Sequence, residues 1–180
     1  MTTILLVRHG ETDWNVERRV QGHSDRPLND NGRAQALALA ETLAGEDLDA
    51  VYSSDLARAF ETARVIAERH GLPVTTLAGL RERNFGTWEG LTDTEIFERF
   101  PAAKTGSWGD AETQAEMHER VLATLREIAA AHPDGCVLVV THGGPLRRLL
   151  VECGSDGNGP VANCALYRVR FGGGRFVGID

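Results

Sequence analysis

Long apolar runs are missing from this sequence. No stretch approaches the roughly 18 apolar residues that a bilayer-spanning helix needs. The first residues, Met1 to Leu6, also lack the charged start and the long apolar core of a signal peptide. The sequence therefore predicts a cytoplasmic protein with no membrane partner.

Cysteine and lysine are scarce. Cys136, Cys153 and Cys164 are odd in number and widely spaced, and no C-x-x-C pair occurs. This pattern predicts reduced thiols rather than a disulfide framework or a zinc site. Lys104 is the single lysine among 19 basic residues, so nearly all positive charge is arginine, whose planar fork of donors binds phosphate well. Genomic base composition could produce the same bias.

Positive charge is in the minority, with 19 basic against 26 acidic residues and a net charge of -7. That sign argues against a nucleic-acid partner. A P-loop of the type G-x-x-x-x-G-K-[ST] and an EF-hand loop are also missing. Any phosphate site must therefore be a local positive pocket, and the sequence implies neither a metal nor another cofactor.

The length and hydrophobic content of the sequence predict one compact domain over residues 1–180. A chain of 180 residues with 42% hydrophobic content can bury a single core. Strand patterns alternate with helical patterns, which predicts a three-layer α/β/α sandwich with a mainly parallel central sheet. The expected strands cover residues 4–7, 49–53, 73–77 and 136–141, with a hairpin of residues 164–170 and 175–179. The expected helices cover residues 33–44, 54–70 with Ser54 or Asp55 as the cap, 92–100, 113–131 and 143–151.

Two histidines directly follow expected buried strands. His9 comes after the first strand and His142 after the most apolar one, and each precedes a glycine. Because the carboxyl ends of parallel strands share one edge of a sheet, both histidines should lie where α/β proteins bind ligands. A helix opened by glycine offers free N–H groups to an anion. The pattern by itself weighs a catalytic and a structural role about equally.

The segments around these histidines resemble the histidine phosphatase, or phosphoglycerate-mutase-like, superfamily. The matching pieces occur in family order over most of the chain, in residues 5–15 (LLVRHGETDWN), 21–22, 25–28, 32–36, 52–59, 62–63, 80–82, 86–90 and 141–144. The resemblance implies a phosphoglycerate-mutase-like fold. It also implies a metal-independent phosphomonoesterase that forms a phosphohistidine.

The resemblance also implies roles for individual residues. His9 matches the nucleophile, with one ring nitrogen free and the other held by a hydrogen bond. Arg8, Arg58 and His142 match the groups that hold the phosphoryl oxygens. Glu82 matches the carboxyl that protonates the leaving oxygen and then activates water. Further matches, to positions that bind substrate or phosphate, are Asn15, Gln21, Gly22 and Gly143.

Two alternatives to these roles stay open. Glu89 is a rival to Glu82 as the proton donor, because family members differ in which position supplies the acid. His9, His23 and His142 could in principle form a zinc site. The neighbouring arginines would repel a cation there, which argues against it.

The segment between Glu82 and His142 bears on the reaction type. Family mutases carry a longer insertion with extra basic residues there, whereas this segment is short and mostly acidic. Hydrolysis is therefore expected, with mutase-type phosphoryl transfer and a non-catalytic phosphate-binding module as alternatives. A pseudoenzyme would be expected to lose His9, Arg8 or Glu82, and all three are present.

The substrate is expected to be a small phosphorylated metabolite, for a protein that is a monomer or homodimer. Residues 85–92 resemble α-ribazole phosphatases and broad-specificity phosphatases about equally. Phe85, Trp88, Phe100 and Trp108 could line an apolar entrance for a bulky leaving group, or could be ordinary core packing.

Overall fold

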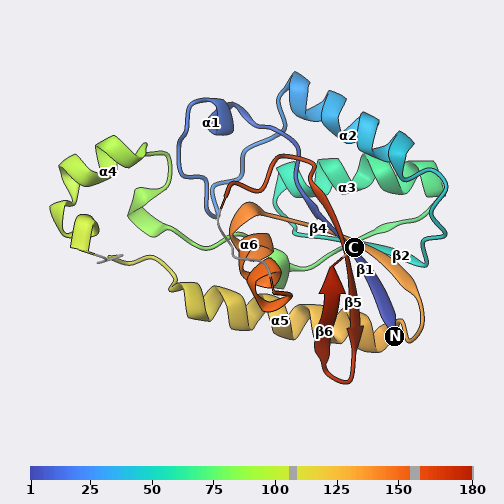
Figure 1. Cartoon of the computed structure of the whole chain (residues 1–180). Coiled ribbons are helices and arrows are strands. Elements are labelled where there is room, and N and C mark those ends of the chain that lie inside the picture. Colours follow the sequence, from blue (N-terminus) through green and yellow to red (C-terminus); the bar gives the residue numbers. More distant parts are fainter. Residues whose placement is uncertain (106–108, 155–158, 180) are drawn as a thin grey trace.

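A six-stranded sheet forms the centre of the computed structural model, which describes residues 1–105, 109–154 and 159–179 (Figure 1). Within these residues the strand order is β3-β2-β4-β1-β5-β6. The parallel strands are β1 (Thr2–Arg8), β2 (Ala50–Ser53), β3 (Val74–Thr76) and β4 (Cys136–Thr141). The hairpin of β5 (Leu166–Gly172) and β6 (Arg175–Ile179) adds two antiparallel strands at one edge. The predicted α/β fold with a mainly parallel sheet is confirmed.

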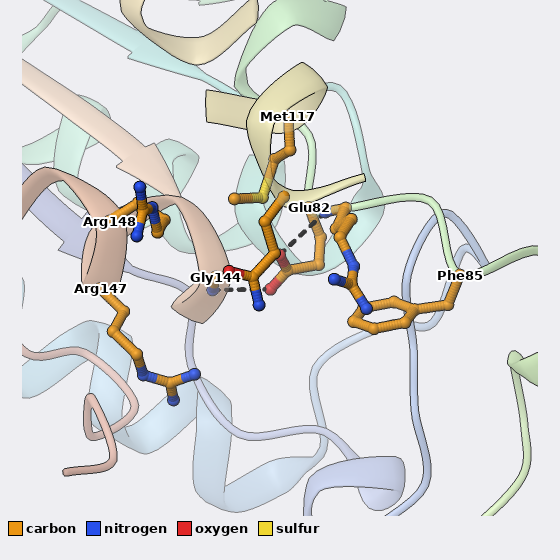
Figure 2. A pocket seen from close by; sticks show the side chains of 8 residues that line it. Glu82, Phe85, Met117, Gly144, Arg147 and Arg148 are labelled. Atoms are coloured by element: carbon orange, nitrogen blue, oxygen red, sulfur yellow. Dashed lines mark hydrogen bonds between the residues drawn. The ribbon is translucent and has the colours of Figure 1, made fainter. Parts of the chain in front are cut away.

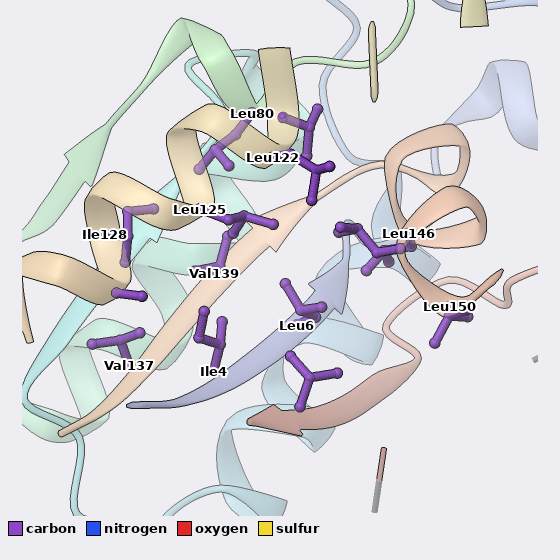
Figure 3. Packing of buried hydrophobic residues seen from close by; sticks show 14 of the residues in the cluster. Ile4, Leu6, Leu80, Leu122, Leu125, Ile128, Val137, Val139, Leu146 and Leu150 are labelled. Carbon is purple, nitrogen blue, oxygen red and sulfur yellow. The ribbon is translucent and has the colours of Figure 1, made fainter. Parts of the chain in front are cut away.

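Helices cover both faces of the sheet (Figure 1). Alternate residues of β1 point to opposite faces, because side chains in a strand alternate. Ile4 and Leu6 pack against helices α5 (Gln114–Ala131) and α6 (Gly143–Glu152), as Figure 3 shows. Leu5 and Val7 pack on the other side against α2 (Asp30–Thr42) and α3 (Ala57–His70). The strand is therefore buried on both faces, as its unbroken apolar run predicts.

The remaining elements are short. They are α1 (Asp13–Val16), α4 (Asp93–Arg99) and the 3₁₀ turns η1 (Ala78–Leu80), η2 (Gly86–Trp88) and η3 (Pro101–Thr105). Figure 1 shows α4 at one end of the molecule, away from the sheet. No helix of the described residues is long and apolar enough to cross a membrane.

Two predicted helix starts are wrong. Helix α2 begins before residue 33, because the Asn29 side chain accepts a hydrogen bond from the Gly32 N–H at 2.8 Å and caps it. Helix α3 has neither Ser54 nor Asp55 at its N-cap position. That position is Leu56, whose side chain makes no cap bond. The carboxylate of Asp25, from a distant loop, accepts from the first helical N–H instead.

Candidate active site

The two strand-end histidines meet at the carboxyl edge of the sheet. Arg8 of β1 lies opposite Thr141 of β4, so the residues that follow are neighbours. The rings of His9 and His142 have centroids 5.1 Å apart and are tilted by 59°. Both side chains are buried. The predicted meeting of these histidines is confirmed.

The His9 ring is held in one orientation by its own loop. Its Nδ1 lies 2.7 Å from the Gly10 carbonyl oxygen, and a carbonyl can only accept, so Nδ1 carries the proton and Nε2 keeps its lone pair. Burial, followed by the charges of Arg58 and Arg8, lowers the pKa of His9 well below its usual range. The imidazole is therefore neutral at pH 7 and presents a nucleophilic Nε2.

The loop after His9 is fixed by close backbone packing. The Gly10 N–H donates to Thr62 Oγ1 at 3.0 Å, and the Thr62 hydroxyl donates in turn to the Arg58 carbonyl at 2.7 Å. A Cβ on Gly10 would lie 2.6 Å from the Gly32 carbonyl oxygen. Thr62 thus ties the histidine loop to the helix that carries Arg58.

Arg58 and Arg8 bring positive charge beside His9. Arg58 is fully buried and donates to the carbonyls of Ser24 at 2.9 Å and Gly22 at 2.8 Å. Burial lowers its pKa to about 10, so it stays charged at pH 7. Arg8 donates to the Val161 carbonyl. The Nε atoms of both arginines are buried and lack partners among the described residues, so both have donors left for an anion.

His142 differs from His9 in having no fixed partner. Neither of its ring nitrogens is hydrogen-bonded to the described part of the chain. Burial, followed by the charge of Arg58, lowers the pKa of His142 well below its usual range. A neutral imidazole still carries one N–H, which can donate to an oxygen of a bound anion.

A cavity of about 160 Å³ opens over His9. It brings together most of the residues that the sequence predicts for the site, namely Arg8, His9, Asn15, Gln21, Gly22, Arg58 and Glu82. Two predicted residues do not line it: His142 lies behind it against the His9 ring, and Gly143 packs against Arg8. Arg19 and Val20 also line the cavity although the sequence analysis did not single them out. We call this space the phosphate cavity.

Glu82 is held at the start of α6. Its Oε2 accepts from the Gly144 N–H at 3.0 Å, and its Oε1 accepts from the Arg83 N–H at 2.8 Å, as the dashed lines in Figure 2 mark. Its main-chain carbonyl accepts from His23 Nε2 at 2.8 Å and from Arg120 Nη2 at 3.2 Å. The contacts of His23 and Arg120 with Glu82 could not be predicted from the sequence, because both residues lie far from Glu82 in the chain; His23 had been considered only as a zinc ligand.

Glu89 is placed differently, although it is close to Glu82 in sequence. One carboxylate oxygen accepts from the N–H groups of His23 and Phe85, at 2.8 and 3.1 Å. The other accepts from the N–H and the hydroxyl of Ser24, both at 2.7 Å. It joins two loops and does not line the phosphate cavity.

Gly22 packs closely against the Glu89 carboxylate that joins these two loops. It has a φ of +51°, and a Cβ there would lie 2.1 Å from Glu89 Oε1. It lines the phosphate cavity, yet the structure also requires glycine here for packing.

A second cavity, of about 200 Å³, is shown in Figure 2. It shares Glu82 and Phe85 with the phosphate cavity. Its other lining residues are Arg83, Gln114, Met117, Gly144, Arg147 and Arg148. The two α6 arginines were not singled out from the sequence. No group of three His, Cys, Asp or Glu side chains within the described ranges could hold a metal ion.

The four aromatic residues were expected either to line an apolar entrance or to pack in the interior. Trp88 is buried and its ring centroid lies 6.3 Å from that of the half-buried Phe100, so these two rings pack against each other and line neither cavity. Phe85 lines both cavities, and the Arg83 guanidinium lies 4.3 Å from its ring centroid. Trp108 lies outside the described residues.

Comparison with known proteins gives consistent matches over nearly the whole chain. A sequence profile of the histidine phosphatase superfamily (branch 1) matches residues 4–178. Phosphoglycerate mutase-like protein 4 of Arabidopsis thaliana is 43% identical over 157 residues, 81% of this chain and 68% of the relative. A metal-independent phosphoserine phosphatase from the same plant is 41% identical over 163 residues, 84% of this chain and 68% of the relative. The solved structure of Bacillus stearothermophilus YhfR superposes with a TM-score of 0.90 at 33% identity, covering 98% of this chain and 94% of that one.

Proposed function

The chain belongs to the histidine phosphatase superfamily and is a phosphomonoesterase of that type, and we propose that it works through a covalent phosphohistidine on His9. The observation that carries this proposal is the hydrogen bond from Nδ1 to the Gly10 carbonyl. It leaves Nε2 unprotonated beside two guanidinium groups. A neutral, oriented imidazole next to fixed positive charge is suited to attack an anionic phosphorus centre.

In the first step, His9 Nε2 forms a bond to phosphorus while the bond to the ester oxygen breaks. Arg8, Arg58 and the His142 N–H hold the other phosphoryl oxygens as charge redistributes. Asn15 and Gln21 contact the phosphoryl group or the substrate. The guanidinium groups supply the charge that a metal ion supplies in P-loop enzymes, and the proposed steps use no metal or other cofactor.

Glu82 supplies the proton in this scheme. Its protonated form gives the proton to the leaving oxygen, and its carboxylate then takes one from the water that attacks the phosphohistidine. That second step releases phosphate and restores neutral His9. The lining of the phosphate cavity supports Glu82 over Glu89 for this role. The substrate in this proposal is a small phosphorylated metabolite, in keeping with relatives named as phosphatases of phosphoserine and of glucosyl-3-phosphoglycerate.

Rapid-quench labelling tests the covalent step. Radiolabelled substrate should leave an acid-labile, base-stable phosphoprotein, and His9→Ala should lose both the label and more than about 10⁴-fold of turnover. His142→Ala is the matched control. It should lose about 10²–10³-fold of kcat, as for removal of one transition-state donor, and should still take the label. A label that survives in His9→Ala would overturn the proposal, and transfer to an acceptor in place of phosphate release would indicate a mutase.

A further inference from the structure

The turn that leads into β5, residues 161–165, lies against the end of β1. The guanidinium of Arg8 donates to the Val161 carbonyl, and the Cys164 N–H donates to the Arg8 carbonyl oxygen at 3.1 Å. The Arg8 N–H donates in turn to the Ala165 carbonyl at 3.2 Å. Cys164 has a left-handed φ of +54° in this turn, a conformation that residues other than glycine keep only where surrounding contacts fix it. The turn therefore holds the residue before the nucleophile through both its main chain and its side chain.

Asn163 of this turn uses both protons of its side-chain amide at the site. Its Nδ2 lies 3.0 Å from the His9 carbonyl oxygen and 3.3 Å from Asn15 Oδ1. Because a carbonyl can only accept, the Asn163 atom that faces His9 must be the NH₂ group, which has two N–H bonds to donate. One amide thus links the main chain of the nucleophile to a side chain that lines the phosphate cavity. Asn163 is itself half-buried and does not line that cavity, so it acts on a substrate only through its two partners.

The amide of Asn15 has one favourable orientation in this arrangement. Its Oδ1 accepts from the N–H and from the hydroxyl of Thr12, both at 3.1 Å, in addition to Asn163. A turned-over amide would place its NH₂ group against the Thr12 N–H and the Asn163 NH₂, so that donors would face donors. Asn15 Oδ1 is therefore committed to these partners. Its Nδ2 has no hydrogen-bond partner among the described residues, so it is the donor that Asn15 can offer to the phosphate cavity.

The partners of Asn15 differ in their origin. The two Thr12 donors belong to the same short segment, because Thr12 is the N-cap of α1. Asn163 lies 148 positions away in the sequence, and its bond ties α1 to the end of β1. His9 keeps other contacts, namely its ring bond and the bond from its N–H to the Thr141 carbonyl at 3.0 Å. Loss of the Asn163 amide should therefore release Asn15 and leave His9 in place.

We propose that Asn163 is a positioning residue, which fixes the Asn15 amide so that Nδ2 donates to a phosphoryl oxygen while His9 attacks. A donor that is already oriented needs no rearrangement when charge develops on that oxygen in the transition state. This inference rests on the proposed function. It adds a residue near the end of the chain, outside the segments that carry the family resemblance.

A double-variant cycle on Asn163 and Asn15 tests this proposal. Asn163→Ala should lower kcat/KM by about 10- to 100-fold, as for a misplaced group at the reacting centre. The factor should be the same for an alkyl phosphate and for p-nitrophenyl phosphate, because a phosphoryl oxygen is affected and not the leaving oxygen. In an Asn15→Ala background the same change should cost less than about 3-fold, because the group that it positions is already missing. Asn163→Asp, which keeps the shape but loses the NH₂ donors, should lose at least as much as Asn163→Ala.

Thr2→Val is the matched control. Thr2 is buried at the other end of β1, and its hydroxyl donates to two main-chain carbonyls, those of Ala129 and His132. Its loss should lower the free energy of unfolding in urea and change kcat/KM of the folded protein by less than about 2-fold.

The outcomes separate this inference from the proposed function. Equal losses from Asn163→Ala with and without the Asn15 side chain would overturn the inference, and so would an Asn15→Ala variant with wild-type activity. If Asn163→Ala does not fold, Asn163→Asp completes the same cycle. A wild-type protein that hydrolyses phosphate esters without a label on His9 would instead overturn the proposed function, and the cycle would still measure the coupling of the two asparagines.

Discussion

Strands β1 and β4 lie side by side, and each ends in a histidine followed by glycine, yet the two strand ends are built differently. At the end of β1, the ring of His9 is fixed by the Gly10 carbonyl, and the Gly10 N–H is bound by Thr62. At the end of β4, the ring of His142 has no partner within the described residues, and the glycines open helix α6. One local pattern thus yields an oriented imidazole with a free Nε2 at one strand and an unbonded imidazole at the other.

The β4 end also carries the proton donor of the proposed mechanism. Gly144 donates its N–H to Glu82, so the start of α6 orients the carboxyl that acts on the leaving oxygen. In the proposed mechanism the nucleophile therefore lies at the end of β1, and the groups that act on the leaving side lie at the end of β4. Pairs of variants test this division of roles between the two strand ends.

The largest expected effect beyond the loss of His9 comes from Glu82→Gln. A general acid matters greatly for a leaving alkoxide of high pKa and little for p-nitrophenolate. The phosphorylation rate constant should therefore fall on the order of 10²–10⁴-fold with an alkyl phosphate and much less with p-nitrophenyl phosphate. The pre-steady-state burst is the proper measurement, because slower dephosphorylation could limit turnover.

Glu89→Gln is the matched control for this prediction. Its carboxylate accepts four hydrogen bonds from two loops, so the variant should lower stability and affect both esters by a similar factor. If Glu89→Gln instead showed the strong dependence on the leaving group, Glu89 and not Glu82 would be the proton donor. The proposed placement of the leaving-side groups at the end of β4 would then be wrong.

A smaller effect is expected from an added methyl group at the start of α6. A Cβ on Gly144 would lie 2.2 Å from Glu82 Oε1, whereas a Cβ on Gly143 would meet Arg8 Nε at 3.4 Å. Gly144→Ala should therefore displace the carboxyl and slow hydrolysis of an alkyl phosphate by about 10-fold, as a partial loss of general acid catalysis. Gly143→Ala should cost clearly less. Equal rates in the two variants would show that the position of Glu82 does not depend on α6.

Features that neighbouring residues determine could be predicted from the sequence, whereas features that depend on residues distant in the chain could not. The apolar run of residues 4–7 is local and sufficed to predict β1 and the place of His9. The cap of α3 could not be predicted, because Asp25 reaches it from another loop. The choice between Glu82 and Glu89 was likewise open, since the two carboxyls are only seven positions apart and contacts with distant residues, Gly144 for Glu82 and Ser24 for Glu89, separate them. The place of Arg147 and Arg148 in the lining of the second cavity could not be predicted, because arginines within a helical pattern resemble ordinary surface residues.

The smallest expected effect concerns the free energy of unfolding. It tests whether both histidines have a lowered pKa despite their different surroundings. Burial lowers the pKa of both rings well below the unfolded value of about 6.5. Below that pH the unfolded chain binds protons that the folded chain does not bind, so the free energy of unfolding falls as the pH falls. Each histidine can contribute at most about 1.4 kcal/mol per pH unit in this range.

Urea unfolding of the wild type, His9→Gln, His142→Gln and the double variant at pH 7.5 and pH 5 measures this loss. Carboxylates titrate in all four proteins, so the differences in loss isolate the two imidazoles. The wild type should lose the most stability between the two pH values, each single variant less, and the double variant least, because glutamine has no proton to bind. A double variant that lost as much as the wild type would mean that the buried rings accept protons when folded. His9 would then be protonated at acidic pH, and its Nε2 could not attack phosphorus before losing that proton.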